Sequence, residues 1–217
     1  MRAPLLVVLR RALPSRSEDR IVQVDIDIKR WLVQLPSVDE LRPGRCPCCG
    51  AAGRPAHGGL GLHGHGLRER QLRGPPEPGA APAIVGLLLR RYLCRRCGAV
   101  IAVVPRGVLR GRLFSAAAIG WALALLALVG LGVAEVRRRV SPWSIVGASA
   151  FSGWAQFRRW IRASRSGALF AAVRASPPRF TPRQVAERAA TTLAALAPIG
   201  THALALDVRS FLGAARG

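Results

Sequence analysis

Apolar and polar residues alternate along Ile21–Ile28 (IVQVDIDI), which is the pattern of a strand with one buried face. We expect this strand to extend through Trp31–Leu35. A Gly/Pro-rich stretch at 74–82 predicts a long hairpin loop further along the chain. Strands are predicted on both sides of this loop and once more after it, at Gly66–Leu72, Ile84–Leu93 and Gly98–Val104.

The pattern becomes helical in the second half of the chain. Residues 113–134 carry no charged side chain, and glycines near the end of this run indicate that one helix stops and another starts. We therefore expect a buried helix over 115–129 and a second helix over 133–140. Pro142 ends the second helix, because proline cannot continue one. Trp121, Leu125 and Leu128 are expected to face a third helix.

The third helix is predicted to run from an N-cap at Ser152 to about Ala163, with one apolar and one polar face. An aromatic inner face combined with a Gln/Arg outer face is what a recognition helix in the DNA major groove requires. An ordinary solvated amphipathic helix has the same pattern. The inner face comprises Trp154, Phe157 and Trp160 or Ile161, and the outer face comprises Gln156, Arg158, Arg159 and Arg162.

Two further helices are expected near the C-terminus. Thr181, Pro182 and Gln184 supply an N-cap, a proline at the first helical position and a capping-box partner. They predict a helix that extends to about Ala197. Another helix is expected over Thr201–Leu212.

Charge changes the picture, because the formal net charge of the 217 residues is +22. The excess lies after residue 45, where 24 basic residues against five acidic ones give a net charge of +19. Such a surplus attracts polyanions, of which nucleic acid is the commonest and anionic membrane surface the other candidate. Only one basic residue is Lys, and a GC-rich genome would explain that preference for Arg.

All five cysteines lie in two short C-x-x-C-G segments, Cys46–Gly50 and Cys94–Gly98. Each segment predicts a tight turn in which the glycine takes a positive φ and backbone N–H groups face the sulfurs. Two such turns supply four thiolates, the number that a tetrahedral structural Zn²⁺ site takes. The expected ligands are Cys46, Cys49, Cys94 and Cys97.

Other residues near these turns leave alternatives open. Cys48 is the spare cysteine of the first segment. His57, His63 and His65 lie between the two segments and could each replace a thiolate, although polar loop positions are the simpler interpretation. Disulfides are not favoured, because no convincing secretory signal precedes them.

The order of these motifs resembles the front end of insertion-sequence transposases. The resemblance covers roughly residues 42–163: C-P-x-C-G, then His65-Gly66-Leu67-Arg68, then R-R-Y-x-C-x-x-C-G, then helices. The chain is also similar to an uncharacterised bacterial family of transposase-related zinc-ribbon proteins. The resemblance implies a zinc ribbon followed by a helix-turn-helix that binds the terminal DNA of the element, with the helix Trp154–Arg162 reading that DNA.

Two departures from this family matter. The turn at Ser141–Phe151 is longer than the three or four residues that usually join the two helices of the motif. Such transposases also cut DNA with three acidic metal ligands on a further domain. Only Glu187 and Asp207 are acidic after the third helix, so we expect no catalytic residues and no enzymatic activity. A nuclease fragment that needs a partner chain is a third hypothesis.

The uncharged run at 113–134 is long enough to span a bilayer. The alternative function is therefore a single-span membrane protein with a cytoplasmic zinc ribbon. Its glycines and the arginines on both flanks favour soluble core helices instead.

The sequence thus predicts an α+β protein, with a small β zinc ribbon followed by an all-α, helix-turn-helix-like bundle. We expect a zinc-dependent, non-catalytic protein that binds double-stranded DNA and is cytoplasmic and nucleoid-associated, with a homodimer left open. The expected divisions are an N-terminal extension (1–41), the ribbon (42–107), the helix-turn-helix-like domain (108–165) and C-terminal helices (166–217).

Overall fold

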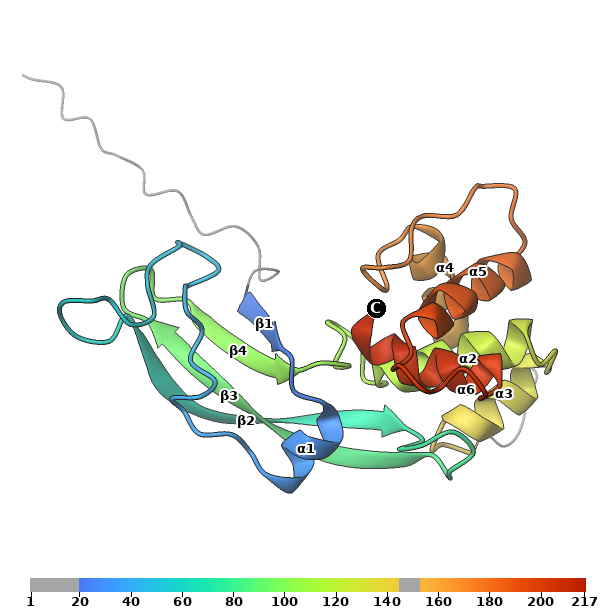
Figure 1. Ribbon diagram of the computed structural model, residues 1–217, viewed down its shortest axis with the longest axis horizontal. Coiled ribbons are helices and arrows are strands. Elements are labelled where there is room, and N and C mark those ends of the chain that lie inside the picture. Colours follow the sequence, from blue (N-terminus) through green and yellow to red (C-terminus); the bar gives the residue numbers. More distant parts are fainter. Residues whose placement is uncertain (1–19, 145–152) are drawn as a thin grey trace, which may run out of the picture. The chain divides into compact units, whose positions relative to one another are not determined.

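Figure 1 shows the computed structural model, which describes residues 20–144 and 153–217. These residues form one four-stranded sheet and six α-helices, so the mixed α+β class is confirmed. The contacts divide the described chain into two compact units. The first unit comprises residues 20–22, 37–67 and 90–103, and the second comprises 23–36, 68–89, 104–144 and 153–217. The finer four-part division of the sequence stays a prediction.

The sheet has the strand order β1-β4-β3-β2. Strands β3 and β4 are antiparallel, with Tyr92 opposite Ile101 and Leu93 opposite Val100. The three strands predicted around and after the hairpin loop are all present. The strands are β1 (Ile21–Val24), β2 (Leu62–Gly74), β3 (Ala83–Cys94) and β4 (Val100–Pro105).

The expected continuation of the first strand through 31–35 is wrong. The strand ends at Val24, and helix α1 (Ile28–Val33) follows. The Asp27 side chain caps this helix by accepting a hydrogen bond from the Arg30 backbone N–H at 2.8 Å. Trp31 is buried, and its Nε1–H donates to the Leu88 carbonyl at 2.8 Å. A local cap and one buried ring therefore override the alternating pattern.

The remaining helices belong to the second unit and match the predicted order. The capping box at Thr181 is present with both of its hydrogen bonds. The predicted N-cap Ser152 lies outside the described residues. The last helix begins later than the predicted Thr201. The helices are α2 (Ala116–Ala127), α3 (Val133–Val140), α4 (Ala155–Arg165), α5 (Pro182–Ala195) and α6 (Leu206–Gly213), followed by a 3₁₀ turn at Ala214–Arg216.

Helix α2 is buried against α5 and α6. At Gly120 a Cβ atom would lie only 2.6 Å from the Cβ of Ala214, so this position needs a glycine for the close approach. The Trp121 Nε1–H donates to the Asp207 carboxylate at 3.2 Å, and the Trp121 ring packs edge-on against Phe211. Trp121 therefore contacts α6, and its expected packing against the third helix of the domain stays a prediction.

The structure interrupts the uncharged run at 113–134. Helix α2 ends at Ala127, and Gly130, with a φ of +84°, turns the chain so that the Leu131 N–H donates to the Leu125 carbonyl at 2.9 Å. No helix within residues 20–144 and 153–217 combines the length and apolar character that a bilayer crossing needs. The membrane-spanning alternative is therefore not supported.

Candidate metal centre and nucleic-acid interface

The two C-x-x-C-G segments form the same turn twice within the first unit. In the first, the Cys46 N–H donates to the Ala51 carbonyl at 2.8 Å, and the Gly50 N–H donates to the Cys46 carbonyl at 2.9 Å. In the second, Cys94 and Gly98 make the corresponding bonds at 2.9 and 2.8 Å. Both glycines have a φ of +70°, as the sequence predicted.

The sheet positions the second turn. This turn joins β3 to β4 and is closed by the paired residues Leu93 and Val100. The first turn lies in the segment before β2 and is closed by a bridge between Arg45 and Ala52. The Arg95 N–H ties this segment to the second turn by donating to the Gly61 carbonyl at 3.0 Å.

The two turns bring four sulfurs together. The Sγ atoms of Cys46, Cys49, Cys94 and Cys97 all lie within 4.8 Å of one another. Two of the pairs, Cys46 with Cys97 and Cys49 with Cys94, are 3.8 and 3.7 Å apart. All are free thiols, so the disulfide alternative is not realised here. These four could bind a metal ion.

The distances match a tetrahedral mononuclear site. Sulfurs placed about 2.3 Å from a central Zn²⁺ are separated by about 3.8 Å along each tetrahedral edge. An iron–sulfur cluster would hold its thiolates further apart, because several iron and sulfide atoms lie between them. The donor set and its spacing therefore fit one tetrahedral thiolate-bound ion.

Backbone N–H groups face the sulfurs and favour their ionised form. Burial by itself raises the pKa of Cys94, but hydrogen bonds from the backbone of Cys97 and Arg96, together with those from the Cys46 and Cys97 side chains, outweigh it and lower the pKa to about 7. Burial raises the pKa of Cys46 despite similar bonds from Cys48 and Cys49. A cation between the sulfurs would favour the thiolate form of all four.

Residues other than the four cysteines support the first turn. The Arg42 side chain is only 5% exposed; it donates to the Leu62 carbonyl and, at 2.6 Å, to Asp39. Its guanidinium lies 5.8 Å from the Tyr92 ring centre. The Tyr92 hydroxyl donates to the Val38 carbonyl at 2.6 Å. Tyr92 belongs to the R-R-Y segment quoted from the sequence, but its contacts with Val38 and Arg42 join distant parts of the chain and have no local signal.

The remaining candidate ligands lie outside the group of four. Among the described residues, the metal-ligating group does not include Cys48, His57, His63 or His65. His57 and His65 are exposed and His63 is half-buried. Their roles as alternative ligands therefore gain no support from the geometry.

The second candidate site is the outer face of α4. Its inner face is anchored as predicted: Phe157 and Trp160 are almost fully buried, and Trp154 is 6% exposed. The rings of Trp154 and Trp160 meet edge-on at 4.9 Å, and Phe114 lies 5.0 Å from Trp160. These aromatic contacts determine which face of the helix points outward.

Arg165 fixes the C-terminal end of α4. Its guanidinium donates to the carbonyls of Pro177, Pro178 and Phe180 at 3.3, 3.0 and 2.6 Å. The three predicted arginines lie elsewhere on the helix: Arg158, Arg159 and Arg162 are exposed, whereas Gln156 is half-buried. Helix α4 therefore carries one arginine with a structural role and three exposed arginines.

The sequence on both sides of α4 is rich in arginine. Between Glu135 and Glu187 the chain contains ten arginines and no acidic residue. Glu135 itself is bonded to Arg138 and Arg139 of α3. The stretch of sequence that contains α4 therefore carries a large excess of positive charge. Residues 141–154 separate α3 from α4, a longer connection than the three or four residues of a helix-turn-helix, so that motif stays a prediction.

Comparisons of the chain with protein-family models, with curated proteins and with solved structures give no match. The transposase resemblance therefore depends on the motifs quoted from the sequence.

Proposed function

We propose that this protein is a zinc-dependent, non-catalytic DNA-binding protein related to the N-terminal part of insertion-sequence transposases. The observation that carries the proposal is helix α4, whose aromatic face is buried while three arginines are exposed in a stretch without acidic residues. The phosphate backbone of duplex DNA is the polyanion that best suits such a surface.

In this proposal the metal has a structural role. Zn²⁺ held by Cys46, Cys49, Cys94 and Cys97 would join the two turns of the first unit. Four thiolates leave no open position for a substrate, which is typical of structural rather than catalytic zinc. The metal is thus expected to support folding.

Absence of catalysis is part of the proposal. Among the residues that the structure describes, the four cysteines form the only group of three or more side chains suited to hold a metal. The carboxylates of Glu77, Glu135 and Asp207 are each engaged, with Lys29, with two arginines and with Trp121 respectively. This arrangement gives no support to a carboxylate-bound metal for cutting DNA.

The proposal is tested by measuring duplex DNA affinity as a function of salt concentration, for the parent and for a triple Ala variant of Arg158, Arg159 and Arg162. If each arginine contacts one phosphate, log K of the variant should depend on log[salt] with a slope smaller by about three. A control that removes the same charge from three positions outside α4 carries Arg30→Ala, Arg68→Ala and Arg110→Ala, all exposed positions.

The control should bind more tightly than the α4 variant at every salt concentration. Equal losses in both variants would show that net charge, rather than the α4 face, determines binding. Mg²⁺-dependent cleavage by the purified chain alone would contradict the non-catalytic part of the proposal.

A further inference from the structure

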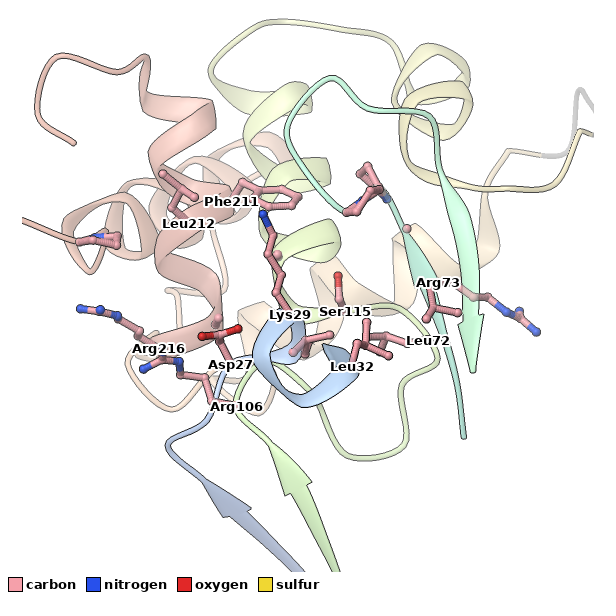
Figure 2. A pocket seen from close by; sticks show the side chains of 18 residues that line it. Asp27, Lys29, Leu32, Leu72, Arg73, Arg106, Ser115, Phe211, Leu212 and Arg216 are labelled. Atoms are coloured by element: carbon pink, nitrogen blue, oxygen red, sulfur yellow. The ribbon is translucent and has the colours of Figure 1, made fainter. Parts of the chain in front are cut away.

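A cavity of about 260 Å³ lies entirely within the second unit, away from the cysteine turns. Figure 2 shows its lining side chains, which come mainly from α1, from the loop end of the β2–β3 hairpin, from α6 and from the 3₁₀ turn that follows α6. Its apolar wall includes Leu32, Leu72, Val85, Phe211 and Leu212. Apolar cavities with a few polar groups at the edge are the usual form of small-molecule sites.

The charged side chains of this cavity are mainly cationic. Lys29, Arg73, Arg106 and Arg216 contribute to the lining, against the single carboxylate of Asp27. Figure 2 labels all five, with Arg106 and Arg216 next to each other on one side of the cavity. The Asp27 carboxylate already accepts a hydrogen bond from the Arg30 backbone N–H as the N-cap of α1.

Two of the four cations are already paired. Lys29 bonds to Glu77 at 2.6 Å, and Arg106 bonds to Asp25. Within the described part of the chain, Arg73 bonds to the neutral Gln71 side chain and lies over the Trp143 ring, and no carboxylate pairs with it. Arg216 is exposed and has no carboxylate partner within the described part of the chain. The edge of the cavity therefore has positive charge left for a ligand.

We propose that this cavity binds a small amphipathic carboxylate, with its apolar tail against Phe211 and Leu72 and its carboxylate on Arg216. The cavity volume of about 260 Å³ limits the ligand to a small molecule, on the order of ten non-hydrogen atoms. Octanoate has this size and charge. Arginine binds carboxylates through two parallel N–H donors, which makes Arg216 the residue that selects an acid over an alcohol.

The test is titration of the full-length, metal-loaded protein with octanoate and with 1-octanol, followed by calorimetry or ligand-observed NMR. We expect octanoate to bind about tenfold more tightly than the alcohol. Arg216→Gln should remove that preference and leave octanol binding unchanged. The matched control Arg174→Gln, at an exposed position that does not line the cavity, should behave like the parent.

A second variant tests the location. Ala117 lines the cavity, and Ala117→Leu should fill part of it and weaken both ligands at least several-fold. Equal affinities of the parent for octanoate and octanol would overturn the proposal. So would a carboxylate preference that Arg216→Gln leaves unchanged, or no binding of octanoate at all. DNA affinity plays no part in these measurements, so the DNA-binding proposal stands or fails separately.

Discussion

Replacing Cys94 by Ser should remove the metal ion from the first unit. Cys94 is fully buried, and its sulfur lies 3.7 Å from that of Cys49, close to the edge length of a zinc–thiolate tetrahedron. A serine hydroxyl in its place is shorter and stays protonated at neutral pH. The variant therefore keeps three thiolates and gains a poor fourth ligand.

The size of the effect follows from the binding energy of such sites. Structural zinc binds with about 10–16 kcal/mol, or roughly 3 kcal/mol for each of four ligands. Since 1.4 kcal/mol is a factor of ten in affinity, loss of one thiolate should weaken binding on the order of a hundredfold. Because metal binding and folding of such units are coupled, the first unit should lose order in the same variant.

The assay is zinc content by elemental analysis, after dialysis against a chelator that leaves the parent loaded, together with circular dichroism. Cys48→Ser is the matched control, because Cys48 lies in the same turn but outside the group of four sulfurs. The parent and the control should each retain one zinc per chain, and Cys94→Ser should retain little. Zinc-free parent protein purified without chelator would refute the reasoning, and so would equal zinc retention by Cys94→Ser and Cys48→Ser.

Three further predictions concern stability and can be measured by thermal or denaturant unfolding. Gly61→Ala should destabilise the first unit by about 1–3 kcal/mol, because a Cβ there would lie 2.1 Å from the Ala52 carbonyl oxygen, whereas Gly44→Ala, with open space around it, should change little. Trp160→Ala should lower the free energy of unfolding by about 3–5 kcal/mol, because it leaves a cavity under α4. Trp143 is half-exposed, so Trp143→Ala should lower it by less than about 1 kcal/mol. Arg165→Ala should lower the free energy of unfolding by about 1–3 kcal/mol, because three carbonyls lose the guanidinium that donates to them. Arg162 is exposed, so Arg162→Ala should leave stability nearly unchanged and weaken only DNA binding. Equal unfolding midpoints within any of these pairs would contradict the packing argument for that pair.

Local signals in the sequence were sufficient for most elements of the second unit. The capping box of Thr181 and Gln184 and the glycine at position 130 each act within a few residues, and the structure has α5 and the end of α2 where they predict. The aromatic residues of α4 recur at helical spacing, so their burial could also be predicted. The residues that pack against them could not be predicted from the sequence.

The metal centre could be predicted from the sequence only in part. Two C-x-x-C-G motifs determine two identical turns, because the glycine and the backbone bonds of each turn lie within six residues. That the four sulfurs meet depends on the sheet and on the segment before β2, which bring residues 46 and 97 within reach of each other. The Arg42 and Tyr92 support belongs to this non-local part.

Helix α1 and the cavity show what only the tertiary structure decided. The alternating residues 21–28 satisfy a strand pattern, yet the chain turns helical at Ile28 because Asp27 caps it and Trp31 finds a buried site whose acceptor, the Leu88 carbonyl, is 57 residues away. The cavity likewise combines α1, the hairpin end and α6, none of which carries a binding motif of its own. Sequence alone determined the structures that close within one turn of chain, whereas contacts between distant residues depend on how the whole core packs.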